Sequence, residues 1–236
     1  MPKKSFAAVQ PSIVETFITG IDDLRSNMVP LNEPHYDDKA FTLFLLLRFH
    51  ANCSFEFYTN EIMLCELMGL STRAENRESI KSNILKMEED GLLYVHADPN
   101  KKFFRITLEY EMFMPEKDFV KIYKEEFDQL MPDNKLLLLL YSIKRFQHKD
   151  TAISFPSIET IMNTSHISRP TVCKGLERLG ALFDIYKARI HFYNGSYKDV
   201  NYYKSHSEPN GISLDAVVNI AKQYYSNVKS ITKKEN

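Results

Sequence analysis

The sequence predicts a mainly helical α+β protein in which two similar helical domains each end in a small β-hairpin. Apolar residues recur at helical spacing in several segments, and two of these segments precede short strand-like runs. The two segments share apolar residues at i, i+4 and i+7: Ile80, Ile84 and Met87 in the first, and Val172, Leu176 and Leu179 in the second. A chain of 236 residues has room for two small domains.

The first 36 residues are expected to form one amphipathic helix followed by a loop. The apolar stripe of this helix runs through Ile13, Val14, Phe17, Ile18, Ile21 and Leu24. Two prolines lie between Met28 and His35, and they favour a loop there.

Residues 37–108 are predicted to be the first domain. Helices are expected at Lys39–His50, at Asn60–Met68 with Thr59 as its N-cap, and over a longer stretch that ends near Asp90, where Gly91 can terminate it. Strands are expected at Phe55–Tyr58, Leu92–His96 and Phe103–Leu108, with a basic turn at 98–102.

Residues 109–133 are predicted to be an acidic helical connector that joins the two domains. It contains 3 basic and 8 acidic residues. Five apolar residues give it a helical stripe: Phe119, Val120, Tyr123, Phe127 and Leu130.

Residues 134–204 are expected to repeat the plan of the first domain. The predicted elements are a helix at Lys135–Phe146, a strand at Ile153–Phe155, a short helix from Ser157 to Ile167 and a helix from Ser168 to Leu179, followed by strands at Phe183–Tyr186 and Arg189–Tyr193. Ser168 can cap its helix, and Pro170 suits the first turn.

Residues 205–236 are expected to hold a last amphipathic helix over 212–231 and a frayed polar tail. The apolar spacing of that helix is near 3.5 residues. It either packs on its own domain or pairs with a second copy of the chain.

The order helix, turn, helix, hairpin is that of a winged helix, a variant of the helix-turn-helix. The segment SRPTVCKGLERL (168–179) with its hairpin resembles the recognition helix of winged-helix DNA-binding proteins. The segment MGLSTRAENRESIKSNILKMEEDGLL (68–93) resembles the first winged helix of replication initiation proteins from bacterial plasmids and phages, including DnaD-like ones. The resemblance implies two winged-helix domains, sequence-specific binding to double-stranded DNA and a homodimer, with replication or transcription machinery as further partners.

The charge distribution agrees with DNA binding by the second domain. Residues 134–204 contain 11 basic and 5 acidic residues, whereas residues 37–108 contain 9 basic and 11 acidic ones. The predicted DNA-binding residues are Arg169, Thr171, Lys174 and Arg178 on helix 168–179, Lys187 and Arg189 on the second hairpin, Arg73, Arg77 and Lys81 around the long helix of the first domain, and Lys101 and Lys102 in its turn. Arginine suits guanine edges, threonine the thymine methyl group and lysine the phosphates. The alternative is a solvated helix face, and in the first domain Glu75 and Glu78 can pair with the cations. Gly175 either allows close approach to the DNA backbone or is only tolerated.

Other functions find little support in the sequence. We see no Walker A motif, nucleophile elbow, metal-ligand spacing or cofactor motif, so we expect neither an enzyme nor a metal or cofactor site. Three cysteines without a CxxC pair favour a reducing cytoplasm. Whether the protein is an initiator or a transcription regulator stays open. So do a winged-helix module that binds protein, and a regulator with a small-molecule pocket between the two halves.

Overall fold

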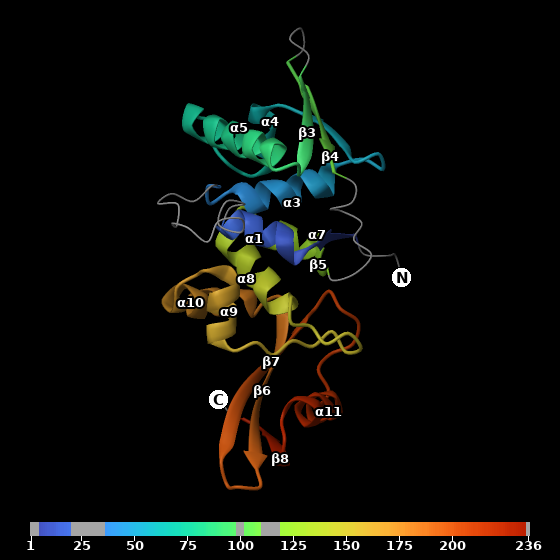
Figure 1. The fold of residues 1–236 in the computed structure, drawn as a ribbon, viewed down its shortest axis with the longest axis vertical. Helices are drawn as coiled ribbons and strands as arrows, with labels where there is room; N and C mark the ends of the chain where they lie inside the picture. Colours follow the sequence, from blue (N-terminus) through green and yellow to red (C-terminus); the bar gives the residue numbers. More distant parts are fainter. Residues whose placement is uncertain (1–4, 20–35, 98–101, 110–118, 235–236) are drawn as a thin grey trace. The chain divides into compact units, whose positions relative to one another are not determined.

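The computed structural model describes residues 5–19, 36–97, 102–109 and 119–234. The described residues are mixed α+β and form three small antiparallel sheets, and the chain divides into two compact units, Met1–Leu138 and Leu139–Asn236 (Figure 1). The division falls inside helix α8 (Asn134–Lys144).

The N-terminal segment of the first unit contributes a strand that the sequence analysis missed. Strand β1 (Phe6–Val9) pairs antiparallel with β5 (Val120–Tyr123), and helix α1 (Pro11–Thr19) follows β1. The stripe residues Ile13 and Val14 are buried on α1, whereas Ile21 and Leu24 lie outside the described residues.

The prediction of a continuous connector helix is therefore wrong at residues 120–123, whereas residues 110–118 of the connector lie outside the described residues. Val120 and Ile122 are buried while Lys121 between them is exposed, which is the period-2 pattern of a strand. Of the described connector residues, Lys124–Leu130 are helical, in α7. Val120 belongs to both the helical stripe and the strand alternation, and the distant strand β1 decides between them by supplying backbone hydrogen bonds.

The remaining elements of the first unit agree with the prediction to within a few residues. They are α3 (Ala40–His50), β2 (Glu56–Thr59), α4 (Glu61–Leu67), α5 (Ala74–Glu89), β3 (Leu93–Ala97) and β4 (Phe104–Leu108), with sheet order β2-β4-β3. Thr59 is not the N-cap of α4, because it ends strand β2. Asn60 takes that role, and its Oδ1 accepts a 2.8 Å hydrogen bond from the amide of Met63. Gly91 follows α5 with a φ of +70°, as its predicted role as a helix terminator requires.

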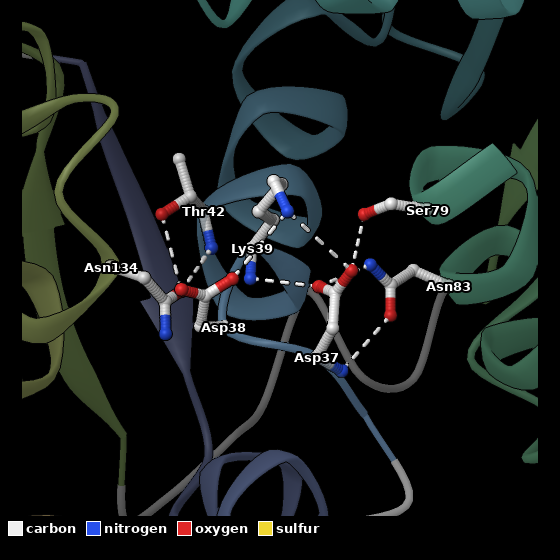
Figure 2. A network of polar contacts seen from close by, with 7 residues as sticks. All are labelled: Asp37, Asp38, Lys39, Thr42, Ser79, Asn83 and Asn134. Carbon is white, nitrogen blue, oxygen red and sulfur yellow. Dashed lines mark hydrogen bonds and ion pairs between the residues drawn. The ribbon is translucent and has the colours of Figure 1, made fainter. Parts of the chain in front are cut away.

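A polar network fixes the start of α3 against α5 (Figure 2). Asp37 accepts hydrogen bonds from the Lys39 amide at 2.8 Å and from the Asn83 side chain at 2.6 Å, and the Ser79 hydroxyl also donates to it. Asn134 Oδ1 accepts from the amide of Thr42 at 2.9 Å. Because the first amides of a helix have no partner within the helix, these side chains satisfy groups that would otherwise be unpaired.

The second unit repeats the order helix, helix, hairpin. Helix α8 is followed by an isolated bridge between Ser154 and Tyr203, then α9 (Ile158–Ser165), α10 (Arg169–Leu179), β6 (Phe183–Phe192) and β7 (Tyr197–Ser205). The predicted turn near Lys187 does not exist, since one strand runs through it. Ala188 and Ile190 face the core and keep that strand continuous. The turn lies at 193–196 instead, where Gly195 has a φ of +83°.

The C-terminal segment forms a helix and then a strand. Helix α11 (Leu214–Tyr224) ends earlier than predicted, and β8 (Val228–Lys233) pairs antiparallel with β6. The prediction of helix to residue 231 with a frayed tail is wrong, because the edge of β6 supplies hydrogen bonds and Ile231 packs on the core. Val217, Ile220 and Ala221 of α11 are buried in the same core cluster as Ala188 and Ile190 of β6, so the helix packs on its own unit.

Candidate nucleic-acid interface

Helix α10 has one buried apolar face, and its basic residues are exposed on either side of that face. Val172, Gly175 and Leu179 are buried, whereas Arg169, Lys174 and Arg178 are exposed and Thr171 is half-buried. Three of the four predicted contact residues are therefore open to a ligand, and the fourth is partly open. Burial of the apolar face fixes the rotation of the helix about its own axis, and this rotation keeps the basic side chains directed to solvent.

The start of α10 departs from the prediction in one detail. Ser168 occupies the N-cap position, but its hydroxyl makes no bond to a backbone amide. It lies 3.1 Å from the hydroxyl of Thr171 instead. Pro170 sits in the first turn, as predicted.

Gly175 is buried on the same side of the helix as Val172 and Leu179. This position favours the second explanation offered for it, that the glycine is tolerated in the helix, over a close approach to DNA.

Arg169 pairs with Glu159 of helix α9. The Arg169 guanidinium lies 2.9 Å from the Glu159 carboxylate, and both side chains are more than half exposed. A hydrogen bond from its own backbone amide, together with those from Arg169 and Ser157, lowers the pKa of Glu159. Since an exposed ion pair contributes little to stability, Arg169 can leave Glu159 for a phosphate or a base at small cost.

Arg189 is held on the outer face of the second hairpin. Its Nε and Nη2 contact Asp199 on the neighbouring strand at 2.8 and 3.0 Å, and Lys234 reaches the same carboxylate at 2.7 Å. Hydrogen bonds from Arg189 and Lys234 hold the pKa of Asp199 well below its usual range. The guanidinium also lies 4.2 Å from the centre of the Tyr197 ring. Arg189 is thus a paired residue of the strand. Lys187, two residues earlier in the sequence and on the same face of the sheet, is exposed.

A groove in the second unit brings two predicted residues together. It has a volume of about 1110 Å³, and Arg169 of α10 and Lys187 of β6 both line it. Three cations that the sequence analysis did not single out also line it: Arg145, Lys198 and Lys234. Lys234 belongs to the C-terminal tail that is expected to fray. Lys198 lies near the hairpin turn at 193–196, whereas the predicted strands place that turn near Lys187. Only the pairing of β6 with β7 and β8 places them here. All residues that line this groove belong to the second unit, so the groove does not bear on the alternative of a small-molecule pocket between the two halves.

The predicted residues of the first unit are not among those that line this groove. Arg73 precedes α5 as its N-cap, and Arg77 and Lys81 are exposed on the helix. Within the described part of the chain none of the three forms an ion pair. An acidic residue of the same helix, Glu88, accepts a 2.7 Å hydrogen bond from the backbone amide of Val95.

The first hairpin offers fewer available cations than the sequence suggests. Lys102 is exposed just before β4, and Lys101 lies outside the described residues. Arg105 of β4 is paired with Glu56 of β2 at 2.9 Å.

Two other kinds of feature are absent from the described residues. No three His, Cys, Asp or Glu side chains among them gather as they would around a metal ion. None of the helices that the structure describes is long and apolar enough to cross a membrane.

Comparison of the chain with models of known protein families gave no match, and no curated protein was found to be similar in sequence.

Proposed function

We propose that the protein is a tandem winged-helix protein that binds specific double-stranded DNA. The order α3, β2, α4, α5, β3, β4 supports this for the first unit, and α8, α9, α10, β6, β7 supports it for the second. In both units the short extended segment after the first helix pairs with the last strand: β2 with β4, and Ser154 with Tyr203 of β7. Shared pairing at a distance supports a common fold more strongly than helix order alone.

The observation that carries the proposal is the two-sided character of α10. Lys174 and Arg178 are exposed on one side of the helix, Arg169 is exposed on the other side of its first turn, and an apolar face between them is buried. This helix follows a short helix and precedes a hairpin. In this role Arg169 and Thr171, at the start of the helix, read base edges in the major groove, and Lys174 and Arg178 contact phosphates. Lys187 adds a phosphate contact from the hairpin.

The function is positional, since the protein marks a DNA site and recruits or excludes other machinery there. It acts as a replication initiator or transcription regulator of a plasmid, phage or similar element. A homodimer would read two half-sites separated by whole turns of the duplex.

A gel-shift titration against fragments from the neighbourhood of the protein's own gene tests the proposal. At about 50 and 200 mM salt, one fragment should survive competitor DNA. Arg169→Ala should relax the base preference at one position of that site, whereas Lys187→Ala should weaken binding to all sequences alike. An unchanged footprint for Arg169→Ala would show that the assigned face is wrong. Repeats beside an AT-rich stretch in the bound fragment would indicate an initiator, and overlap with a promoter would indicate a regulator.

A protein-binding module is the second candidate, and one observation favours it. Three aromatic residues in or next to the sheet β2-β4-β3 expose about half or more of their surface: Tyr58 59%, Tyr94 49% and Phe103, just before β4, 50%. Aromatic residues are enriched in protein interfaces. Heparin chromatography separates the two functions, because a DNA-binding protein is retained past moderate salt and a module of this second kind flows through.

A further inference from the structure

The groove of the second unit has a composition that contact with a duplex does not require. Five basic residues line it, against two carboxylates, those of Glu159 and Asp199. Both carboxylates already contact cations, Glu159 through Arg169 and Asp199 through Arg189 and Lys234. The groove is therefore a positive site that suits a polyanion or a phosphorylated molecule.

Aromatic rings form another part of the same groove. Tyr224, at the end of α11, is 60% exposed, and its ring meets Phe155 edge to face with 4.9 Å between centres. Tyr225 also lines the groove, and the ammonium group of Lys198 lies 4.9 Å from the centre of its ring. An exposed ring braced by a second ring is a rigid surface on which a planar group can stack.

The groove follows the free edge of strand β7. This strand lies at one end of the sheet order β7-β6-β8, and its consecutive residues 198–201 line the groove. Cations from both faces of the sheet meet there, since Lys187 and Lys198 project to opposite sides. The volume of about 1110 Å³ slightly exceeds that of pockets for small ligands, which run from about 300 to 1,000 Å³.

Cations beside an exposed aromatic ring are the arrangement that binds unpaired nucleotides. In a duplex the bases are stacked on one another, so Tyr224 has no free base face to contact. We propose that this groove binds unpaired nucleotides, with phosphates among Arg145, Lys198 and Lys234 and a base stacked on Tyr224. The shared chemistry is a phosphate joined to a planar base, and its source is a single strand or a free nucleotide.

This inference can be tested separately from the duplex-binding proposal, although Arg169 and Lys187 line the groove and are also assigned duplex contacts above. Tyr224 and Lys198 belong to α11 and β7, whereas Lys174 and Arg178 lie on α10 and do not line the groove. One pair of residues can therefore fail its test while the other passes.

Fluorescence anisotropy of the full chain with a labelled oligothymidylate of about eight nucleotides tests the proposal. Tyr224→Leu should weaken binding at least about fivefold through loss of stacking, and Lys198→Ala should weaken it and reduce its salt dependence. Tyr224→Phe keeps the ring and should bind like the unchanged chain. The variant with Lys174→Ala and Arg178→Ala is the matched control, and it should bind the oligonucleotide normally.

Competition by unlabelled TMP and AMP identifies the source of the nucleotide. If the unlabelled oligonucleotide displaces the probe at concentrations far below those that TMP or AMP require, the natural ligand is a single strand. If TMP or AMP displaces the probe with equal potency, the ligand is a free nucleotide. Both results support the groove as a nucleotide site. The proposal is overturned if the unchanged chain binds neither probe, or if Tyr224→Leu binds as tightly as Tyr224→Phe. Gel shifts of the same variants with duplex DNA report separately on the function of α10.

Discussion

Helices α5 and α10 hold equivalent places in the two units, yet they differ in charge. Both follow a short helix and precede a hairpin, and both bury the first and last residues of the shared apolar pattern: Ile80 and Met87 in α5, and Val172 and Leu179 in α10. Helix α5 contains three basic and four acidic residues, whereas α10 contains three basic residues and one acidic one. Burial is therefore common to the two helices, and surplus positive charge belongs to α10 alone. We therefore expect the second unit, rather than the first, to bind an anionic ligand through this helix.

A second difference lies at one buried position of the shared pattern. Asn83 of α5 aligns with Gly175 of α10, since each lies three residues after the first apolar residue of its helix. Asn83 binds Asp37 and so ties α5 to the start of α3, whereas Gly175 carries no side chain that could make such a tie. Helix α5 is held by polar contacts as well as by packing, whereas α10 is held mainly by packing of its apolar residues.

Equal burial predicts equal loss of stability. Met87→Ala and Leu179→Ala should each lower the free energy of unfolding by about 2–5 kcal/mol, because each leaves a cavity in a fully packed site. Denaturant unfolding followed by circular dichroism measures both. Leu85→Ala on the exposed side of α5 is the control and should change stability by less than about 0.5 kcal/mol. A small loss at Leu179 with a large one at Met87 would break the equivalence.

The polar tie of α5 predicts the next largest effect. Asn83→Ala should cost about 1–3 kcal/mol, because it leaves the amide and one carboxylate oxygen of Asp37 without their Asn83 partner. The comparison variant is Gly175→Ala, in which no hydrogen bond is lost. Amide hydrogen exchange at the start of α3 should rise in Asn83→Ala only. If it rose equally in both variants, the tie would not be specific to α5.

The charge difference predicts unequal effects on DNA binding. Lys174→Ala with Arg178→Ala should weaken duplex binding about tenfold and lower the salt slope by nearly two, since about 0.9 is lost per phosphate contact. Arg77→Ala with Lys81→Ala removes the same number of cations from α5 and should change the affinity little. Gel shifts across a salt series compare the two. Equal losses from both pairs would show that both units contact DNA.

The smallest effect concerns the ion pair that crosses the second hairpin. The pKa of Asp199 is lowered in the folded chain, so its pairing with Arg189 and Lys234 stabilises at pH above its ordinary value of about 3.9. This stability is lost as the pH falls through the lowered folded pKa. Asp199→Asn should therefore lower the melting temperature slightly at neutral pH, and the difference should shrink under acidic conditions and in high salt. A difference that grew with acidity would contradict the assignment.

The sequence determined the elements whose signals are local. Helical spacing located α3, α4, α5, α8, α9 and α10 within a few residues, and Gly91 marked the end of α5, because side-chain burial and glycine conformation act over one or two turns. The exposed placement of Arg169, Lys174 and Arg178 also followed from the apolar spacing of their own helix.

Only the tertiary structure decided which strands pair and what the pairs bring together. Residues 6–9 meet 120–123, and residues 228–233 meet β6, although nothing in either local pattern names its partner. The unpaired edge of a sheet can form hydrogen bonds with almost any extended segment. Residues 228–233 therefore form a strand because an edge is available to them, although their local pattern predicts a helix. Strand pairing in the second unit also brought Lys198 and Lys234 to the groove that Arg145 lines, although the three come from distant segments. Local periodicity fixes each helix face, but hydrogen bonding between distant strands determines which faces share a site.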